Sequence, residues 1–244
     1  MICRAGLVAC GVLFLLASSP AMAQDISISL GEGGSITTRT VQLILLITVL
    51  SLAPGLAIMI TCFPFIITVL SILRQGIGLQ QSPPNMLLVS LALFLTYFVM
   101  EPVFTAAWEA GIAPLLNEEL ELETALSRAL IPFRGFMAAR MDIETFTAMA
   151  ALRPETNLEA DLQDAPLSIL VPSFMLSEIA RAFQVGFLLF LPFLIIDLVV
   201  AAILMSMGMM MVPPAIVSLP FKLAFFVVAD GWSLVADGLV RGYF

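Results

Sequence analysis

The sequence has 244 residues, of which 61% are hydrophobic and 11% are charged, and its formal net charge is −8. A soluble domain carries about 25% charged residues, so this composition excludes a soluble globular protein and predicts an all-α polytopic membrane protein. The sequence contains no histidine, which excludes histidine-based catalytic triads and histidine-ligated metals. We therefore expect no metal, no cofactor, no nucleic-acid partner and no enzymatic activity.

Residues 1–23 have the pattern of a cleavable signal peptide. Arg4 precedes an apolar run, which the sequence "SSP" ends, and the small residues of "AMA" follow. This pattern predicts cleavage between Ala23 and Gln24. The alternative is an uncleaved first transmembrane helix, but the apolar run is short for a span of about 20 residues. Residues 24–40 are expected to form a polar lead outside the cytoplasm.

Residues 41–108 are predicted to form a first pair of hydrophobic helices. Their first 33 residues contain no charge. As one straight helix these would be about 50 Å long, which is more than the hydrocarbon core of about 30 Å. We therefore expect long kinked helices, with a break at Pro54-Gly55 or at Pro64. After a polar turn, a further apolar helix is expected over residues 86–108.

Residues 109–166 are more polar and are predicted to form an acidic helical region. Asn117 precedes a helical segment with acids in its first turns, and Asp142 can cap a second helix, "IETFTAMAAL". A loop is expected after this second helix.

The charge distribution predicts the orientation in the membrane. Between Glu101 and Arg181 there are 13 acids and 5 arginines, which account for the whole net charge of −8. An acidic loop carries no signal for cytoplasmic retention. We expect the acidic region to be periplasmic and the loop that contains Arg74 to be cytoplasmic.

Residues 167–244 are predicted to form a second pair of hydrophobic helices joined by a methionine-rich loop, "MSMGMMMVPP". The long first helix should begin near Pro172. Near the end of the sequence, Asp230 and Asp237 are seven residues apart and should form a polar stripe on one face of a helix.

Two ionisable residues, Asp197 and Lys222, lie deep in this apolar region. A hairpin folded at their midpoint places each about 18 Å from the turn, so their depths match and we predict an ion pair. If the turn is centred elsewhere, Lys222 needs another acid, such as Glu178. The pair could orient two helices, or it could form a proton or substrate site.

Several long segments resemble one known family. They are "RQGIGLQQSPPN", "LALFLTYFVMEPVF", "FQVGFLLFLPFLIIDLVVAAIL", "GMMMVPP" and "SLPFKLAFFVVADGW". They resemble the FliP/SctR family, the core subunits of the type III export gate of bacterial flagella and injectisomes. The resemblance covers roughly residues 43–108 and 167–232. One position departs from the family pattern: Phe65 stands where an arginine is usual, so no polar contact is expected from it.

The resemblance implies a role in protein export. About five copies would assemble with FliR-like and FliQ-like subunits into a helical ring around a pore, through which unfolded export substrates pass. The signal peptide favours the flagellar branch. The implied location is the bacterial inner membrane, in the flagellar basal body, with a periplasmic region.

Within this family, the methionine-rich loop is predicted to be a pore gate. Met209, Met210 and Met211 repeated around a ring would form a deformable apolar gasket, because methionine is flexible and fills irregular gaps. Pro213 and Pro214 would stiffen the base of the loop. The alternative is ordinary hydrophobic core at a helix end.

A solute transporter that uses Asp197 and Lys222 is the alternative function. Transporters are often built from inverted repeats, and none is visible between the two hydrophobic halves. An intramembrane enzyme is disfavoured because the sequence lacks Gly-x-Ser-Gly and Gly-x-Gly-Asp motifs.

Overall fold

The computed structural model describes residues 36–244, except residues 80–81, 154–161 and 210. The signal-cleavage prediction at Ala23 and Gln24 lies outside the described residues. By its contacts the chain divides into two compact units, Met1–Val49 and Leu50–Phe244. In the described residues all regular structure is helical.

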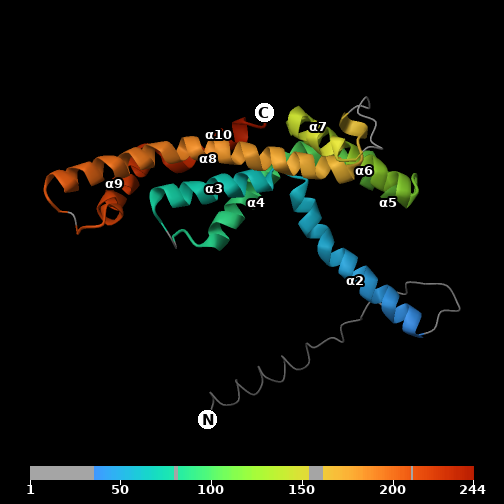
Figure 1. The fold of residues 1–244 in the computed structure, drawn as a ribbon. Coiled ribbons are helices and arrows are strands. Elements are labelled where there is room, and N and C mark those ends of the chain that lie inside the picture. Colours follow the sequence, from blue (N-terminus) through green and yellow to red (C-terminus); the bar gives the residue numbers. More distant parts are fainter. Residues whose placement is uncertain (1–35, 80–81, 154–161, 210) are drawn as a thin grey trace, which may run out of the picture. The chain divides into compact units, whose positions relative to one another are not determined.

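The helical elements follow one another along the chain, and Figure 1 labels α2 to α10. They are α2 (Ile36–Met59), α3 (Phe63–Ile77), α4 (Asn85–Ala107), a π-helical turn η1 (Trp108–Ile112), α5 (Ala113–Leu116), α6 (Leu122–Arg140), α7 (Ile143–Ala151), a 3₁₀ turn η2 (Leu162–Asp164), α8 (Leu167–Ser206), α9 (Pro214–Val228) and α10 (Gly231–Arg241).

The long uncharged segment is broken once, between α2 and α3. Helix α2 already includes residues 36–40 of the predicted lead, and it continues through Pro54 and Gly55, so of the two possible breaks the one near Pro64 is formed. The break follows Met59, and Pro64 lies in the first turn of α3. Proline is tolerated at that position because the first N–H groups of a helix have no partner within it.

Helices α3 and α8 form the centre of the second unit and lie side by side (Figure 1). A Cβ on Gly186 of α8 would lie 2.5 Å from Ile72 Cδ1 of α3, so the two helices approach closely at this glycine. In a membrane, such close packing holds helices together, since the lipid is as apolar as the side chains. The buried face of α3 follows helical spacing: Phe65, Ile66, Val69, Leu70 and Leu73.

Helix α4 forms over nearly the predicted range, and its path continues through η1 into α5. At Gly111, in η1, a Cβ would lie 2.3 Å from the Ala125 carbonyl oxygen of α6. Only glycine therefore permits this approach. Helix α6 begins at Leu122, four residues later than predicted, because Asn117 caps the end of α5 and Glu118 has a positive φ of 59°.

The second half of the unit begins with a capped helix and a very long one. Asp142 caps α7 as predicted, because its Oδ2 accepts hydrogen bonds from Thr145 N (3.0 Å) and Thr145 Oγ1 (2.8 Å). Helix α8 begins at Leu167, before the predicted Pro172, which lies inside it. Its 40 residues correspond to about 60 Å of helix.

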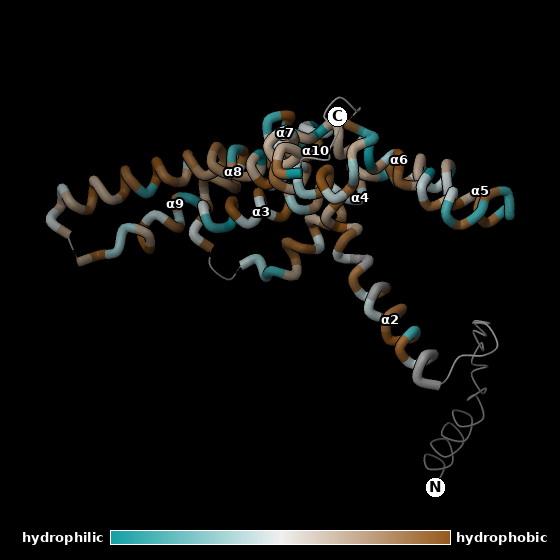
Figure 2. The backbone as a smooth tube through the Cα atoms, turned by 45° about the vertical axis from the view of Figure 1, so that its right-hand side comes forward, coloured by the Kyte–Doolittle hydropathy of each residue, from teal (hydrophilic) through white to brown (hydrophobic). Residues whose placement is uncertain are grey.

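Within the part of the chain that the structure describes, three helical segments are long and apolar enough to cross a membrane: Thr40–Met59, Asn85–Leu116 and Leu167–Ser206. The pair α9 and α10, bent by 63°, could form one more. The hydrophobic colour follows α8, and hydrophilic residues concentrate around α5 and α6 (Figure 2). The chain is therefore an all-α polytopic membrane protein.

The bend between α9 and α10 separates the two acids that were predicted to share a helix face. Asp230 has a left-handed backbone, with φ of 49°, and lies between the helices. Asp237 lies inside α10 and pairs with Arg241, at 2.8 Å. The predicted polar stripe is therefore wrong, because the helix does not continue through Asp230.

Candidate functional site

The α8–α9 hairpin brings Asp197 and Lys222 together. Lys222 Nζ lies 2.5 Å from Asp197 Oδ2 and donates a second hydrogen bond of 3.0 Å to the Gly76 carbonyl oxygen. Ser218 Oγ donates to Asp197 Oδ1 at 2.5 Å. Since Gly76 is in the last turn of α3, the lysine also satisfies a carbonyl that the helix leaves without an internal partner. One ammonium group thus joins α3, α8 and α9.

The two partners differ in exposure. The Lys222 side chain is 7% exposed, and the Asp197 side chain is 32% exposed. A lone charge in a membrane segment is costly, and pairing it lowers that cost. The pair therefore lies at the edge of the packed helices, with the ammonium group inside and part of the carboxylate outside.

The methionine-rich turn lies at the far end of this hairpin. Helix α8 ends at Ser206, and the chain turns at Gly208, which has a positive φ of 75°. The turn is closed by hydrogen bonds from Met209 N to Leu204 O (3.0 Å) and from Val212 N to Met209 O (3.3 Å).

The described methionines of this turn are exposed. Met211 is 97% exposed and Met209 is 42% exposed, while Met210 lies outside the described residues. Pro213 precedes α9 as its N-cap, and Pro214 is its first residue. Neither methionine is core of this single chain, so ordinary hydrophobic core does not describe them here.

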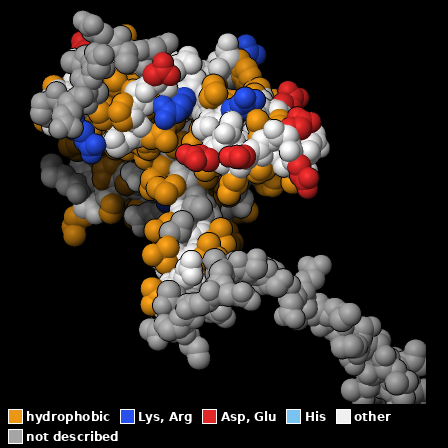
Figure 3. All heavy atoms as spheres, turned by 90° about the vertical axis from the view of Figure 1, so that its right-hand side faces the viewer, with side chains coloured by type: hydrophobic (Ala, Val, Ile, Leu, Met, Phe, Trp, Pro, Cys, Tyr) orange, Lys and Arg blue, Asp and Glu red, His pale blue; other side chains and the backbone are white. Residues whose placement is uncertain are grey.

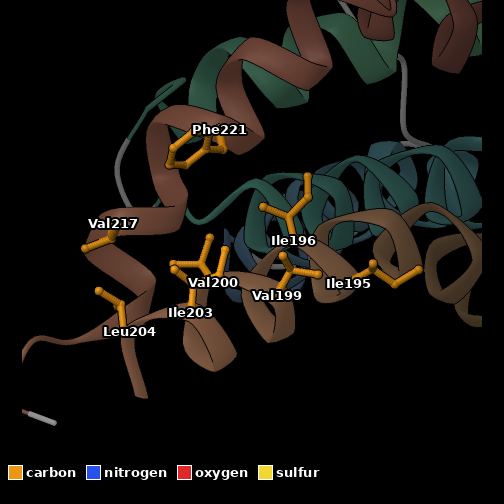
Figure 4. Close-up of a pocket in the computed structure, with 8 residues that line it drawn as sticks. All are labelled: Ile195, Ile196, Val199, Val200, Ile203, Leu204, Val217 and Phe221. Atoms are coloured by element: carbon orange, nitrogen blue, oxygen red, sulfur yellow. The ribbon is translucent and has the colours of Figure 1, made fainter. Parts of the chain in front are cut away.

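An apolar pocket of about 420 Å³ lies between the two arms of the hairpin. Figure 4 shows its side chains coming from both helices. The α8 side chains are Ile195, Ile196, Val199, Val200, Ile203 and Leu204, and the α9 side chains are Val217 and Phe221. The arms are therefore loosely packed around this pocket.

Glu178 is the centre of a separate polar cluster, away from Lys222. It is fully buried in α8, and its Oε1 accepts from Arg140 Nε and Arg181 Nη1, both at 3.3 Å. Its Oε2 accepts from the Tyr243 hydroxyl at 2.5 Å. Glu178 is therefore not the partner of Lys222. A buried carboxylate with these donors is compensated in both charge and hydrogen bonding.

Tyr243 holds the last residues of the sequence against this cluster. The Arg140 guanidinium lies 4.0 Å from the centre of its ring, and Arg140 Nη1 donates to the Gly242 carbonyl oxygen at 2.6 Å. Phe65 meets the Tyr243 ring edge-on, at 5.7 Å between centroids. Burial, followed by the charge of Glu178, raises the pKa of the Tyr243 hydroxyl well above its usual range, so it remains a donor.

Sequence reasoning missed Arg140 and Tyr243. The one available signal was Glu178 itself, an acid in an apolar helix that needs a partner. Phe65, the position that departs from the family pattern, makes an aromatic contact with Tyr243.

An acidic surface covers the end of the α5–α6 region. Figure 3 shows carboxylates gathered on this face, with basic side chains nearby. The exposed acids of this surface are Glu118, Glu119, Glu121 and Glu123.

The model of the FliP family matches residues 46–239. The chain belongs to the FliP family. Proteins named flagellar biosynthetic protein FliP are 51% identical in Caulobacter vibrioides, over 97% of this chain and 87% of that protein, and 47% identical in Agrobacterium fabrum, over 86% of each. The one from Bacillus subtilis is 45% identical over 84% of this chain and 93% of that protein.

Membership of the FliP family confirms the resemblance seen in the sequence. The chain is a membrane-embedded component of the flagellar export apparatus, where it acts with other subunits. The family match includes the Asp197–Lys222 pair and the methionine-rich turn, and it ends before Tyr243.

Proposed function

We propose that the chain is the pore-forming subunit of the flagellar protein export gate. About five copies, with FliQ-like and FliR-like subunits, would surround a pore in the bacterial inner membrane. Unfolded flagellar substrates would pass through this pore. Membership of the FliP family supports the proposal, and the exposed methionine turn is the observation that carries it.

Met209, Met210 and Met211 are the proposed gate. In a ring of copies, the exposed thioethers would meet at the axis and form a dry constriction, which resists ions by dewetting. Such a ring would still yield to polypeptides of any sequence, because thioethers make no strong hydrogen bonds. Pro213 and Pro214 fix the base of the turn, so movement would be concentrated in the methionines.

The geometry of the Asp197–Lys222 pair favours a structural role over solute transport. The ammonium donates to Asp197 and to the Gly76 carbonyl oxygen, and its side chain is almost fully buried. A transport site must release its ligand and change partners during the cycle. A lysine that joins three helices is better suited to fixing their arrangement.

Residues 109–166 are the proposed periplasmic region, and the loop after α3 is the proposed cytoplasmic one. The exposed acids of α5–α6 support this orientation, since retained loops are rich in lysine and arginine. A reporter that is active only in the periplasm should give signal when fused after Glu119 and none after Ser82. The opposite result would reverse the orientation.

Replacing Met209, Met210 and Met211 together by alanine tests the gate. The ring should widen and admit water, so cells should leak ions or small solutes while the complex still forms. Leucine at the same positions keeps the bulk and should retain the seal, with slower export because the side chains adapt less well. Membrane conductance is measured beside copurification of the subunits. An intact alanine complex without leak would contradict the gate, and loss of the complex would assign the methionines to assembly.

A further inference from the structure

A cavity of about 460 Å³ lies where the end of α3 meets the start of α9. It is separate from the apolar pocket inside the α8–α9 hairpin, and its lining includes two cationic side chains. Its lining residues are Arg74, Gln75, Gly78, Leu79, Ala215 and Lys222.

Among the residues that the structure describes, no acid neutralises the charge of Arg74. Arg74 Nη1 donates to Asn85 Oδ1, a neutral acceptor that orients the guanidinium. Within the described parts of the chain, Arg74 forms no ion pair. Lys222, by contrast, is balanced by Asp197. The cavity therefore carries one excess positive charge.

Both cations have donors to offer a ligand. A guanidinium carries several N–H groups in a planar fork, and Arg74 uses one of them on Asn85. The Lys222 ammonium also keeps a donor beyond those it uses on Asp197 and Gly76. A planar fork beside a point charge is a combination that suits phosphate oxygens.

Gly78 forms part of one wall of the cavity. It closes α3 with a positive φ of 89°, and a Cβ there would lie 3.5 Å from Leu219 Cδ1 and 4.0 Å from Lys222 Nζ. Leu79 and Ala215 add apolar surface beside the cations. A cationic pocket with an apolar wall, between helices of a membrane protein, fits a phosphate group attached to a lipid.

We propose that this cavity binds a phosphate oxyanion through Arg74, with Lys222 as the second cation. The phosphate can come from the headgroup of an anionic phospholipid or from free phosphate. The site does not depend on the proposed pore gate, since none of its residues belongs to the methionine turn. A bound phosphate would neutralise the excess charge between α3 and α9.

The test is native mass spectrometry of the purified full-length protein, in complex with its copurifying subunits. Three probes are titrated: phosphatidylglycerol, phosphatidylcholine and inorganic phosphate. We expect phosphatidylglycerol to be retained more strongly than phosphatidylcholine, whose choline group offsets the phosphate charge. Arg74→Gln should weaken retention about tenfold or more, since it removes charge-assisted hydrogen bonds. Competition by inorganic phosphate would identify free phosphate as a sufficient ligand, and retention of lipid alone would assign the headgroup.

Arg153→Gln is the matched control. Arg153 is an exposed arginine that, like Arg74, has a neutral partner, here Ser168 Oγ at 3.1 Å, and its loss should leave retention unchanged. If Arg74→Gln does not assemble, Asn85→Ala replaces it and should weaken retention several-fold by releasing the guanidinium. No retention of any probe by the unmodified protein, or equal retention by the Arg74 or Asn85 variant and the control, would overturn the proposal.

Discussion

The Tyr243 hydroxyl donates a hydrogen bond of 2.5 Å to the carboxylate of Glu178, a residue 65 positions earlier in the sequence. This bond connects the last residues of the sequence to the middle of the unit formed by Leu50–Phe244. Arg140 contacts both partners, through the carboxylate of Glu178 and the ring of Tyr243. The tail is therefore part of the compensation that a buried carboxylate requires.

Replacing Tyr243 by phenylalanine should destabilise the protein. The ring contacts with Phe65 and Phe136 remain, but the bond to a charged acceptor is lost, which typically costs about 1.5–3 kcal/mol. Denaturant unfolding of the purified protein measures the change. Tyr97→Phe is the control, because Tyr97 is 62% exposed and should tolerate the change. Equal midpoints for both variants would show that the Tyr243 hydroxyl contributes no stability.

The pair of Asp197 and Lys222 should behave as a coupled unit. Lys222→Met leaves the Asp197 carboxylate with Ser218 alone, and Asp197→Asn leaves a buried ammonium without its counter-charge. Removing one partner of a buried pair costs about 3–5 kcal/mol, and we expect the lower part of that range because Asp197 is one-third exposed. The double variant should recover part of the loss in assembly yield.

An exposed ion pair in the same chain provides the control for these single and double substitutions. Arg241 and Asp237 are separated by 2.8 Å, with side chains that are 79% and 54% exposed. Arg241→Met should change assembly little, since exposed pairs contribute about 0–1 kcal/mol. If the Asp197 and Lys222 losses simply add in the double variant, the two residues are not energetically coupled.

Gly111 should be intolerant of any side chain. An added Cβ would meet the backbone of Ala125, at 2.3 Å from its carbonyl oxygen, so a rotamer change could not relieve the clash. Gly111→Ala should therefore separate η1 from α6 and lower the unfolding midpoint. Gly135→Ala in α6 is the control, because its Cβ would meet nothing within 4 Å and alanine is the better helix former. Equal stability of the two variants would refute the predicted contact.

The start of α7 should depend on pH. The hydrogen bonds from Thr145 hold the pKa of Asp142 below its ordinary value. The stabilisation that the ionised Asp142 carboxylate gives to α7 is therefore fully present above the unfolded-state pKa of about 3.9. It is lost as the pH falls through the lower folded-state pKa. After correction for the intrinsic exchange rate, which itself falls on acidification, the amide protection of α7 should decrease as the pH falls, and Asp142→Asn, which can still cap, should lose that pH dependence. The same acid response in Asp142→Asn would place its cause elsewhere.

The sequence predicted the elements whose signal is local. Apolar run length identified the spans, and the Asp142 cap follows from one residue and its neighbours. The matching depths of Asp197 and Lys222 could be worked out from helical rise. The later start of α6 could not, because it depends on Glu118 adopting a positive φ, which its side chain does not favour.

Long-range partners were beyond sequence reasoning. The contacts of Glu178 with Arg140 and Tyr243 depend on how α6, α8 and the tail meet in space, and no spacing rule contains that information. The bend at Asp230 could not be predicted from the spacing of residues either. A seven-residue spacing implies a common face only if the helix is continuous, and here Asp230 lies in a left-handed turn between α9 and α10.

The ion pair of Asp197 and Lys222 fixes the two arms of the α8–α9 hairpin to each other at one point along their length. Among the described residues, the hydrogen bonds from Lys222 and Ser218 to Asp197 are the polar contacts between the two arms. From there α8 continues to Ser206, about 13 Å farther at helical rise, beside the apolar pocket. Between this ion pair and the methionine-rich turn, the described residues of the two arms can slide past each other without breaking a hydrogen bond between them. A polypeptide that pushes on the tip would therefore displace the methionines, while the attachment of the hairpin to α3 stays intact.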